Sequence, residues 1–406
     1  LLICDYTLMT LSVLRLKPKE DKRLRQGHLW IYSNEVDTKA TPLKSFTPGE
    51  QVLVESNQGK ALGVAYVNPN SLICARMLSR RPKPFGHGQM MQKIKQALAL
   101  RKACFDEPYY RLVYGDSDGL PGLVVDRFGD YLVVQISTAG MEAMKNQILA
   151  SLTGVFENAK GILWKNDGKM RQQEGLEEYV EVAMGDVPEF LPAIENGTRF
   201  DVPVWKGQKT GWFYDHRLNR ERIIRHVKGK RVLDMFSYIG GWGVQAANSG
   251  ASHVTCVDAS EQALDWVMQN AELNAVQDKM QCIKGDAFKV MEKLIEEQQQ
   301  FDVIILDPPA FIPKRKDINA GERAYQKLNQ LGMRLLANDG LLVSASCSMH
   351  LSESSLDRIL CQSGRHLDRH VQIIERGSQG PDHPVHPGIA ETRYIKSVMC
   401  RVAYNV

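Results

Sequence analysis

The second half of the chain alternates short apolar runs with helical patterns, and this alternation limits the possible folds more than any other feature. Helical segments such as Ser260–Leu273 separate the apolar runs, and alternating strands and helices build a doubly wound α/β sheet. Ligands of such sheets bind beyond the carboxyl ends of the strands. We therefore expect functional residues directly after each strand. The predicted strands are Arg231–Phe236, Val254–Asp258, Met280–Ile283, Phe301–Leu306 and Leu341–Ser346.

Glycines and carboxylates follow the first three predicted strands. The turn after the first strand is rich in glycine, which lets backbone pass close to a ligand before a helix begins. Asp258 ends the second strand, where a carboxylate accepts hydrogen bonds from ribose hydroxyls. Asp286 follows the third strand and suits an adenine amino group. Together these turns predict an adenosine-type cofactor, either NAD or S-adenosylmethionine. The residues assigned to it are Phe236, Ser237, Tyr238, Gly240, Gly241, Asp258 and Asp286.

The turn after the fourth predicted strand favours S-adenosylmethionine. Asp307-Pro308-Pro309 holds one carboxylate and a backbone carbonyl rigidly in the cleft, an arrangement that fits methyl transfer to a planar nitrogen heterocycle and has no use in a dehydrogenase. We assign Asp307 and Pro308 to the cofactor cleft, and Asp307 also to the edge of the base. An aromatic residue directly after the prolines would favour an exocyclic amino group as methyl acceptor, because its ring would stack on an extruded base. Ala310 occupies that position.

A cysteine follows the fifth predicted strand, in Ser346-Cys347-Ser348. This position puts a thiol at the same edge of the sheet as the fourth turn. Carbon 5 of a pyrimidine is a poor nucleophile, but a thiolate that adds to carbon 6 makes carbon 5 able to attack a sulfonium methyl group. Cys347 is therefore the predicted catalytic nucleophile, with Asp307 as its catalytic partner. Any other cysteine of this chain is expected to be a small core residue.

The N-terminal region is basic and rich in short strands. Between Ser12 and Lys83, thirteen Lys and Arg stand against six Asp and Glu, whereas the whole chain carries only +4, so the remainder is slightly acidic. Alternating runs broken by Pro and Gly predict a small β-rich barrel. A basic module beside an acidic body is typical of a domain that holds a polyanion, although a solvated basic surface is the alternative. The residues expected to contact RNA are Lys22, Arg23 and Arg25, together with Lys314, Arg315 and Lys316 after the fourth turn. Aromatic residues interleave with the first group, and we expect Trp30 and Tyr32 to be core residues.

A second module follows a linker at Arg80–Gly88, and it carries no chemical motif. A helix over Met90–Lys102 and strands at Gly122–Val125 and Tyr131–Ile136 predict a small α+β domain. Asp116, Asp118 and Asp126 lack the spacing of a calcium loop and are expected to be turn residues. The predicted domains are 11–82, 88–200 and 201–406.

Composition limits the class of protein. The chain is 43% hydrophobic and 24% charged, as in ordinary globular proteins, and it has no C-x-x-C pair, so no metal site is predicted. No stretch reaches the roughly 18 apolar residues of a membrane span. The apolar start Leu1–Met9 contains Asp5 and follows no basic region, so we expect a cytoplasmic protein without a cleaved signal.

Five motifs in this order closely resemble the bacterial 23S rRNA large-subunit methyltransferase I family, which are S-adenosylmethionine-dependent cytosine-C5 enzymes. The motifs are Gln208–Arg217, Phe236–Gly241, Asp307–Phe311, Ser346–Ser348 and Asp382–Pro384. The resemblance implies an N-terminal PUA domain, a small central domain and a class I methyltransferase domain. It also implies that Cys347 is the nucleophile and that Gln208, Thr210 and Arg217 help to enclose the cofactor.

The leading hypothesis is therefore synthesis of 5-methylcytosine in 23S rRNA or a large-subunit precursor, with a homodimer left open. One alternative is an amino-group methyltransferase that acts on an RNA purine and does not need Cys347. Another is a non-catalytic RNA-binding factor of ribosome assembly that has kept a cofactor fold. Substitution of Cys347 separates the first two hypotheses, and turnover on ribosomal RNA separates both from the third.

Overall fold

The computed structural model describes residues 11–405, so the predicted features of Leu1–Met9 lie outside the described residues. The chain forms two compact units. The first comprises the described part of Leu1–Leu191 together with Pro203–Trp212 and Pro381–Thr392, and the second comprises the remainder. The three expected ranges 11–82, 88–200 and 201–406 stay a prediction about domains, because the compact units divide the chain differently.

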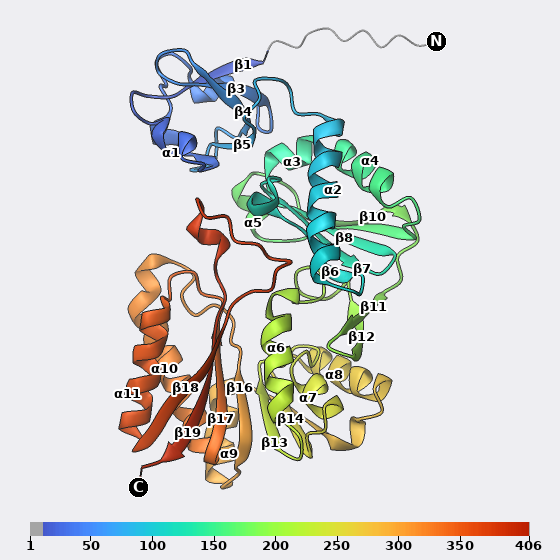
Figure 1. Cartoon of the computed structure of the whole chain (residues 1–406), viewed down its shortest axis with the longest axis vertical. Helices are drawn as coiled ribbons and strands as arrows, with labels where there is room; N and C mark the ends of the chain where they lie inside the picture. Colours follow the sequence, from blue (N-terminus) through green and yellow to red (C-terminus); the bar gives the residue numbers. More distant parts are fainter. Residues whose placement is uncertain (1–10, 406) are drawn as a thin grey trace. The chain divides into compact units, whose positions relative to one another are not determined.

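The first unit begins with a five-stranded sheet in the order β1-β3-β4-β5-β2 (Figure 1). β1 is parallel to β3, and the other neighbours are antiparallel. Alternate residues of β3 and β4 face one core, where Val52, Val54 and Ala65 are fully buried. The elements are β1 Ser12–Arg15, α1 Lys22–Arg25, β2 Trp30–Ile31, β3 Gln51–Glu55, β4 Ala61–Val67 and β5 Ala75–Ser79. Trp30 and Tyr32, expected in the core, are only half-buried.

A second five-stranded sheet of the first unit has the order β10-β9-β8-β7-β6. The helix predicted at Met90–Lys102 is confirmed as part of α2, and the strand predicted at Tyr131–Ile136 is β8. Apolar residues of α2, α4 and this sheet form one core. The elements are α2 His87–Cys104, β6 Tyr109–Tyr114, β7 Leu123–Phe128, β8 Tyr131–Ile136, α3 Ala139–Ala143, α4 Lys145–Val155, β9 Gly161–Asn166, α5 Met170–Gln173 and β10 Tyr179–Gly185.

The interpretation of three aspartates as turn residues is wrong for Asp126, whereas Asp116 and Asp118 do lie in a short 3-10 turn, Gly115–Asp118. Asp126 lies in β7, is fully buried, and forms two hydrogen bonds of 2.8 Å with Arg111. Asp118 likewise forms two bonds with the fully buried Arg101, at 2.7 and 2.8 Å. Asp116 accepts a 2.7 Å hydrogen bond from Nε1 of Trp30. Buried carboxylates need such partners, and the spacing in sequence could not show arginines that pair across the sheet.

The second unit contains a seven-stranded sheet in the order β15-β14-β13-β16-β17-β19-β18. All five predicted strands are present, and they are parallel to one another. The last strand, β19, was not predicted and runs antiparallel to both β17 and β18, so the sheet is mixed rather than wholly parallel. Its strands are β13 Arg231–Met235, β14 His253–Asp258, β15 Met280–Lys284, β16 Phe301–Leu306, β17 Leu336–Ser346, β18 Arg369–Gly377 and β19 Lys396–Tyr404. A separate hairpin pairs β11 Phe190–Glu195 with β12 Thr198–Pro203.

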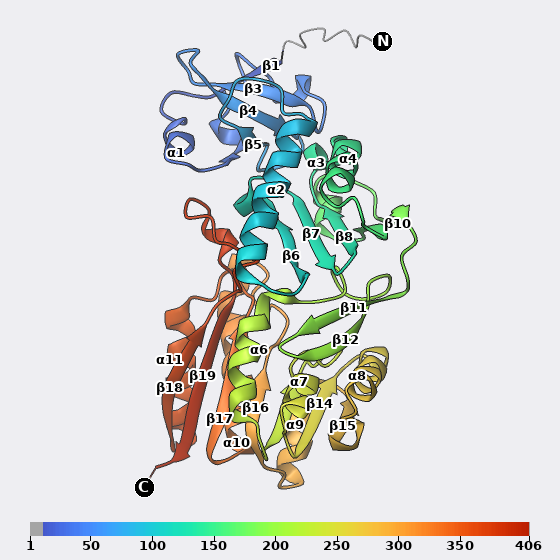
Figure 2. The ribbon, with the colours of Figure 1, turned by 45° about the vertical axis from the view of Figure 1, so that its right-hand side comes forward.

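Helices cover both faces of the seven-stranded sheet. Residues of α9, α10 and α11 share one buried core with β13, β16 and β17, while α6 and α7 lie on the other face (Figure 2). The helices are α6 Arg217–Ile223, α7 Gly243–Asn248, α8 Glu261–Leu273, α9 Ala287–Glu296, α10 Ile318–Leu335 and α11 Glu353–His366. Within residues 11–405, no helix has both the length and the apolar character that crossing a membrane requires.

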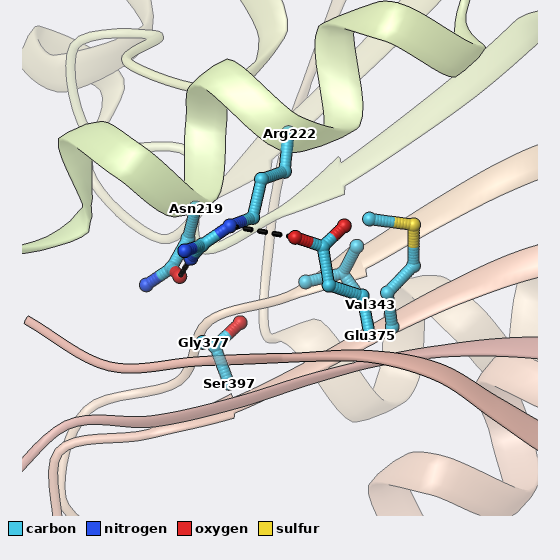
Figure 3. Close-up of a pocket in the computed structure, with 7 residues that line it drawn as sticks. Asn219, Arg222, Val343, Glu375, Gly377 and Ser397 are labelled. Carbon is cyan, nitrogen blue, oxygen red and sulfur yellow. Dashed lines mark hydrogen bonds and ion pairs between the residues drawn. The ribbon is translucent and has the colours of Figure 1, made fainter.

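An ion pair attaches α6 to the edge of the sheet. Arg222 of α6 lies 2.7 Å from Glu375 of β18 and donates to Asn219 Oδ1 at 2.9 Å (Figure 3). Glu375 follows an irregularity in the β18 register. The cavity beside this pair measures about 10 Å³, close to the space that one water needs. This feature is therefore part of the packing of α6.

Candidate active site

The turn after β13 holds its backbone in an unusual conformation. Phe236 and Tyr238 have φ of 64° and 49°, and Gly240 has φ of 85°. Side chains rarely adopt positive φ, so two such non-glycine residues in one turn indicate a tightly determined loop. A Cβ on Gly243 would lie 2.5 Å from Cys256 Sγ, which explains why glycine begins α7 at this close approach.

Asp234 lies fully buried beneath this turn. Its Oδ2 accepts a 2.8 Å hydrogen bond from the Gly243 N–H, while no described residue donates to its Oδ1. Burial raises the pKa of Asp234 to about 8, and the negative charges of Asp307 and Asp258 act in the same direction. Burial and these neighbouring charges thus favour the protonated, neutral form of Asp234 near pH 7.

Asp258 connects the first and second turns. Its Oδ2 accepts from the Tyr238 N–H and its Oδ1 from the Ser260 N–H, both at 2.9 Å. Carboxylate oxygens have further lone pairs, so these bonds leave capacity for a ligand hydroxyl. The side chain therefore also shapes the loop, which the sequence did not indicate. Asp286 is exposed, caps α9 by accepting from the Lys289 N–H at 3.1 Å, and follows β15 as predicted.

Asp307 follows β16, and two side chains that sequence reasoning missed lie beside its carboxylate. Its Oδ2 accepts a 2.9 Å hydrogen bond from Nε1 of Trp242, and its Oδ1 lies 3.4 Å from Nε2 of His216. The carboxylate keeps 21% of its surface exposed, so it remains accessible. Trp242 directly follows Gly240-Gly241 in the turn after β13. This position was the one signal in the sequence that indicated a role for Trp242.

Aromatic rings connect these turns to one another. Phe311, at the end of the fourth turn, lies 6.5 Å from Phe236, 6.2 Å from Phe288 and 4.9 Å from Tyr325, measured between ring centroids. Such separations lie within or close to the range of favourable aromatic pairs. The turns after β13, β15 and β16 therefore share one aromatic cluster.

Cys347 follows β17 and is flanked by two buried serines. The hydroxyl of Tyr325 in α10 lies 2.8 Å from Ser346 Oγ and 2.9 Å from Ser348 Oγ. Ser348 Oγ also accepts a 3.2 Å hydrogen bond from the Ile312 N–H, directly after the fourth turn. These bonds hold the thiol-bearing turn against the Asp307 turn, as the order of motifs predicted. The Cys347 residue itself is partly exposed.

Gln208, Thr210 and Arg217 are the remaining residues assigned to the cofactor. Gln208 and Thr210 belong to the first compact unit, where the buried Thr210 hydroxyl donates to Asp126 Oδ2 at 2.5 Å. Arg217 belongs to the second unit, with its guanidinium 5.7 Å from the Tyr214 ring centroid. Their assignment to the cofactor stays a prediction.

The predicted RNA-contacting residues differ in their availability. Lys22 is exposed, and so are Lys314, Arg315 and Lys316, which follow the fourth turn. Arg23 lies 2.6 Å from Glu35 and 5.0 Å from the Tyr32 ring centroid, so it supports the fold around Tyr32. Arg25 is paired with Asp21 at 2.5 Å on the surface. Among residues 11–405, no group of three or more His, Cys, Asp or Glu is placed to hold a metal ion.

Comparison with known proteins agrees with this geometry. Residues 14–80 match the model of a PUA-like domain, and residues 170–392 match the model of S-adenosylmethionine-dependent methyltransferases. The chain is 35% identical to ribosomal RNA large subunit methyltransferase I of Aliivibrio fischeri and 36% identical to that of Erwinia tasmaniensis. Each alignment covers 97% of this chain and 100% of the relative.

Solved structures share the fold. A SAM-dependent methyltransferase from Streptococcus mutans superposes with a TM-score of 0.81 at 21% identity, over 96% of this chain and all of that chain. A methyltransferase complexed with SAH gives 0.82 at 22% identity with the same coverage.

The buried Asp234 predicts a pH dependence of stability. Its pKa of about 8 exceeds the ordinary 3.8, so between these values the folded protein keeps a proton that the unfolded chain releases. The free energy of unfolding should therefore fall as pH rises, by at most about 1.4 kcal/mol per pH unit from this group. Asp234→Asn imitates the protonated carboxyl and cannot titrate. Its melting temperature without cofactor should thus decline less than that of wild type between about pH 5 and pH 8.

The matched control is Asp286→Asn, on an exposed carboxylate of a neighbouring turn. It should reproduce the wild-type pH profile of thermal unfolding. If wild type and Asp234→Asn lose stability in parallel, Asp234 is not protonated in the folded protein.

Proposed function

Because this chain belongs to the ribosomal RNA large subunit methyltransferase I family of S-adenosylmethionine-dependent enzymes, we propose that it methylates carbon 5 of a cytosine in 23S rRNA through a covalent Cys347 adduct. The observation that carries this proposal is the position of Cys347. Its turn is bonded through Ser348 to the backbone after Asp307, so a thiol and a carboxylate stand on adjoining turns. A substrate of this kind would place the enzyme in the cytoplasm.

The cofactor would occupy the turns after β13, β14 and β15. S-adenosylmethionine supplies an electrophilic methyl group on a positively charged sulfur. Asp258 would accept from the ribose hydroxyls and Asp286 from the adenine amino group. The backbone from Phe236 to Gly241 would pass beside the cofactor, with Asp234 beneath that turn and Asp307 and Pro308 at its far side. Thr210, Gln208 and Arg217 would help to enclose it, as the resemblance implies.

The proposed chemistry uses the thiol twice. The Cys347 thiolate adds to carbon 6 of cytosine, forming an S–C bond and pushing the electron pair of the 5,6 double bond to carbon 5. Carbon 5 then takes the methyl group. Loss of the carbon 5 proton restores the double bond, and the S–C bond breaks to return the thiolate. Asp307 would hold the base edge at N3 and the amino group, which stabilises charge as the thiolate adds.

RNA that contains 5-fluorocytosine tests the covalent step, because fluorine does not leave carbon 5 as a proton does. With S-adenosylmethionine, wild type should form a complex that survives denaturation and migrates slowly on a gel. Cys347→Ala should lose both this complex and methyl transfer to rRNA, down to the level without enzyme. Cys361→Ala, on the exposed face of α11, is the matched control and should retain both.

Methylation by Cys347→Ala would contradict the thiol mechanism. The same RNA would then be analysed for methylated purine amino groups, which is the product of the alternative enzyme. Cofactor binding without any turnover on ribosomal RNA would instead support a non-catalytic assembly factor.

The cofactor assignment is tested at Asp258. Asp258→Asn retains an oxygen that can accept one of the two backbone hydrogen bonds but loses the charge that would bind ribose. A charged hydrogen bond contributes about 1.5–3 kcal/mol, so calorimetry should show about ten- to hundredfold weaker S-adenosylmethionine binding. Asp278→Asn, before the start of β15, lies away from these turns and should bind normally. Equal affinities of all three proteins would refute the role of Asp258.

The PUA-like domain would bind the phosphates of the RNA backbone through lysine and arginine side chains on its surface. Lys22→Glu should weaken RNA binding and reduce the slope of log affinity against log salt by about 0.7–0.9 for each phosphate that the domain no longer neutralises. Lys60→Glu makes the same charge change in the hairpin between β3 and β4. A salt titration that gives equal slopes for both variants would show that Lys22 does not bind phosphate specifically.

A further inference from the structure

Lys396 begins β19 beside the cysteine turn. In the antiparallel pairing of β17 with β19, Lys396 lies opposite Ser346, the residue before Cys347. Its Nζ donates a 2.7 Å hydrogen bond to the carbonyl oxygen of Ser348, the residue after Cys347. The side chain therefore extends along the whole Ser346–Ser348 turn. Lys396 is 8% exposed, so its ammonium group is held in a largely water-free environment.

Three charged groups act on Lys396: the negative form of Cys347, Glu353 and Arg393. No ion pair of Lys396 with a carboxylate is present within the part of the chain that the structure describes, residues 11–405. Glu353 at the start of α11 pairs with Arg393 at 2.5 Å, so these two charges largely cancel. Burial lowers the pKa of Lys396, and the negative form of Cys347 acts against this, ahead of Glu353. Tyr325 of α10 is also close to Cys347, but burial raises its pKa, so it stays neutral.

We propose that Lys396 is a positioning residue whose buried ammonium group stabilises Cys347 in its thiolate form, an inference that rests on the proposed thiol mechanism. The thiolate is the reactive form of cysteine, and a nearby cation favours it. Attraction between opposite charges is stronger where water is excluded. The same cation helps twice, because the thiolate is both the attacking group and the group that leaves carbon 6. The Ser348 hydrogen bond fixes the ammonium group in place.

The experiment measures alkylation of Cys347 by iodoacetamide as a function of pH in the full-length protein without RNA. Mass spectrometry of the peptides separates Cys347 from the exposed Cys104 and Cys361, which serve as internal references. In wild type, the reaction of Cys347 should rise at lower pH than that of Cys361. Lys396→Gln, which keeps a hydrogen-bond donor, should move the Cys347 midpoint upward by about one pH unit or more, or about tenfold in thiolate fraction near neutral pH.

Lys396→Arg keeps the charge and should leave the Cys347 midpoint close to that of wild type. A purely structural role of Lys396 would alter reactivity without moving the midpoint. An unchanged midpoint in Lys396→Gln, or a wild-type Cys347 midpoint no lower than that of Cys361, would overturn the proposal. The comparison of the Cys347 and Cys361 midpoints in wild type tests the proposal even if the variants fold poorly.

The outcomes separate this inference from the proposed function. If the Lys396→Gln midpoint shifts but wild type is not trapped by 5-fluorocytosine RNA, the electrostatic coupling stands and the cytosine mechanism fails. If wild type is trapped and the midpoint does not shift, the cytosine mechanism stands and the role of Lys396 fails.

Discussion

The hydroxyl of Tyr325 is the point on which the geometry of this site depends. It bonds both serines that flank Cys347, and through Ser348 it reaches the backbone that follows the Asp307 turn. All of these groups are buried. If the network opened, each hydroxyl would lose a hydrogen-bond partner that water could not replace. Two turns from neighbouring parallel strands are therefore held at one separation. The proposed reaction, in which the thiol and the carboxylate contact the same base, needs such fixed spacing.

Three carboxyl groups gather at the cofactor end of the same sheet. Asp234 and Asp258 lie near the ends of β13 and β14, and Asp307 follows β16. The charges of Asp258 and Asp307 are one reason why the pKa of the buried Asp234 is raised. A methyl donor with a positively charged sulfur suits such surroundings, whereas its product has lost that charge. The geometry of the glycine turn and the electrostatics of the site thus favour the same ligand. On the other side of Cys347, Lys396 supplies the opposite charge at the position where the proposed mechanism requires a thiolate.

Much of this arrangement could be read from the sequence because parallel strands bring their carboxyl ends to one edge. Periodicity alone located five strands, and the residues that end or follow them include Asp258, Asp307 and Cys347. The sequence did not indicate which side chains from distant parts of the chain contact these residues. Trp242 and His216 approach Asp307 only after folding, and Lys396 stands on the antiparallel β19, which was not predicted. The buried Asp126 of β7 was misread as a turn residue because its partner Arg111 lies on another strand, β6.

The chain passes between its two compact units five times, and the last passage has a consequence for how the enzyme matures. After β18 the backbone contributes Pro381–Thr392 to the first unit before it returns as β19, which inserts between β17 and β18. Protein synthesis runs from the N-terminus, so β19 is made after both of the strands between which it lies. The cysteine turn is thus translated before the lysine that lies beside it. If Lys396 acts as proposed, a chain in which β19 has not yet paired with β17 would carry an ordinary thiol.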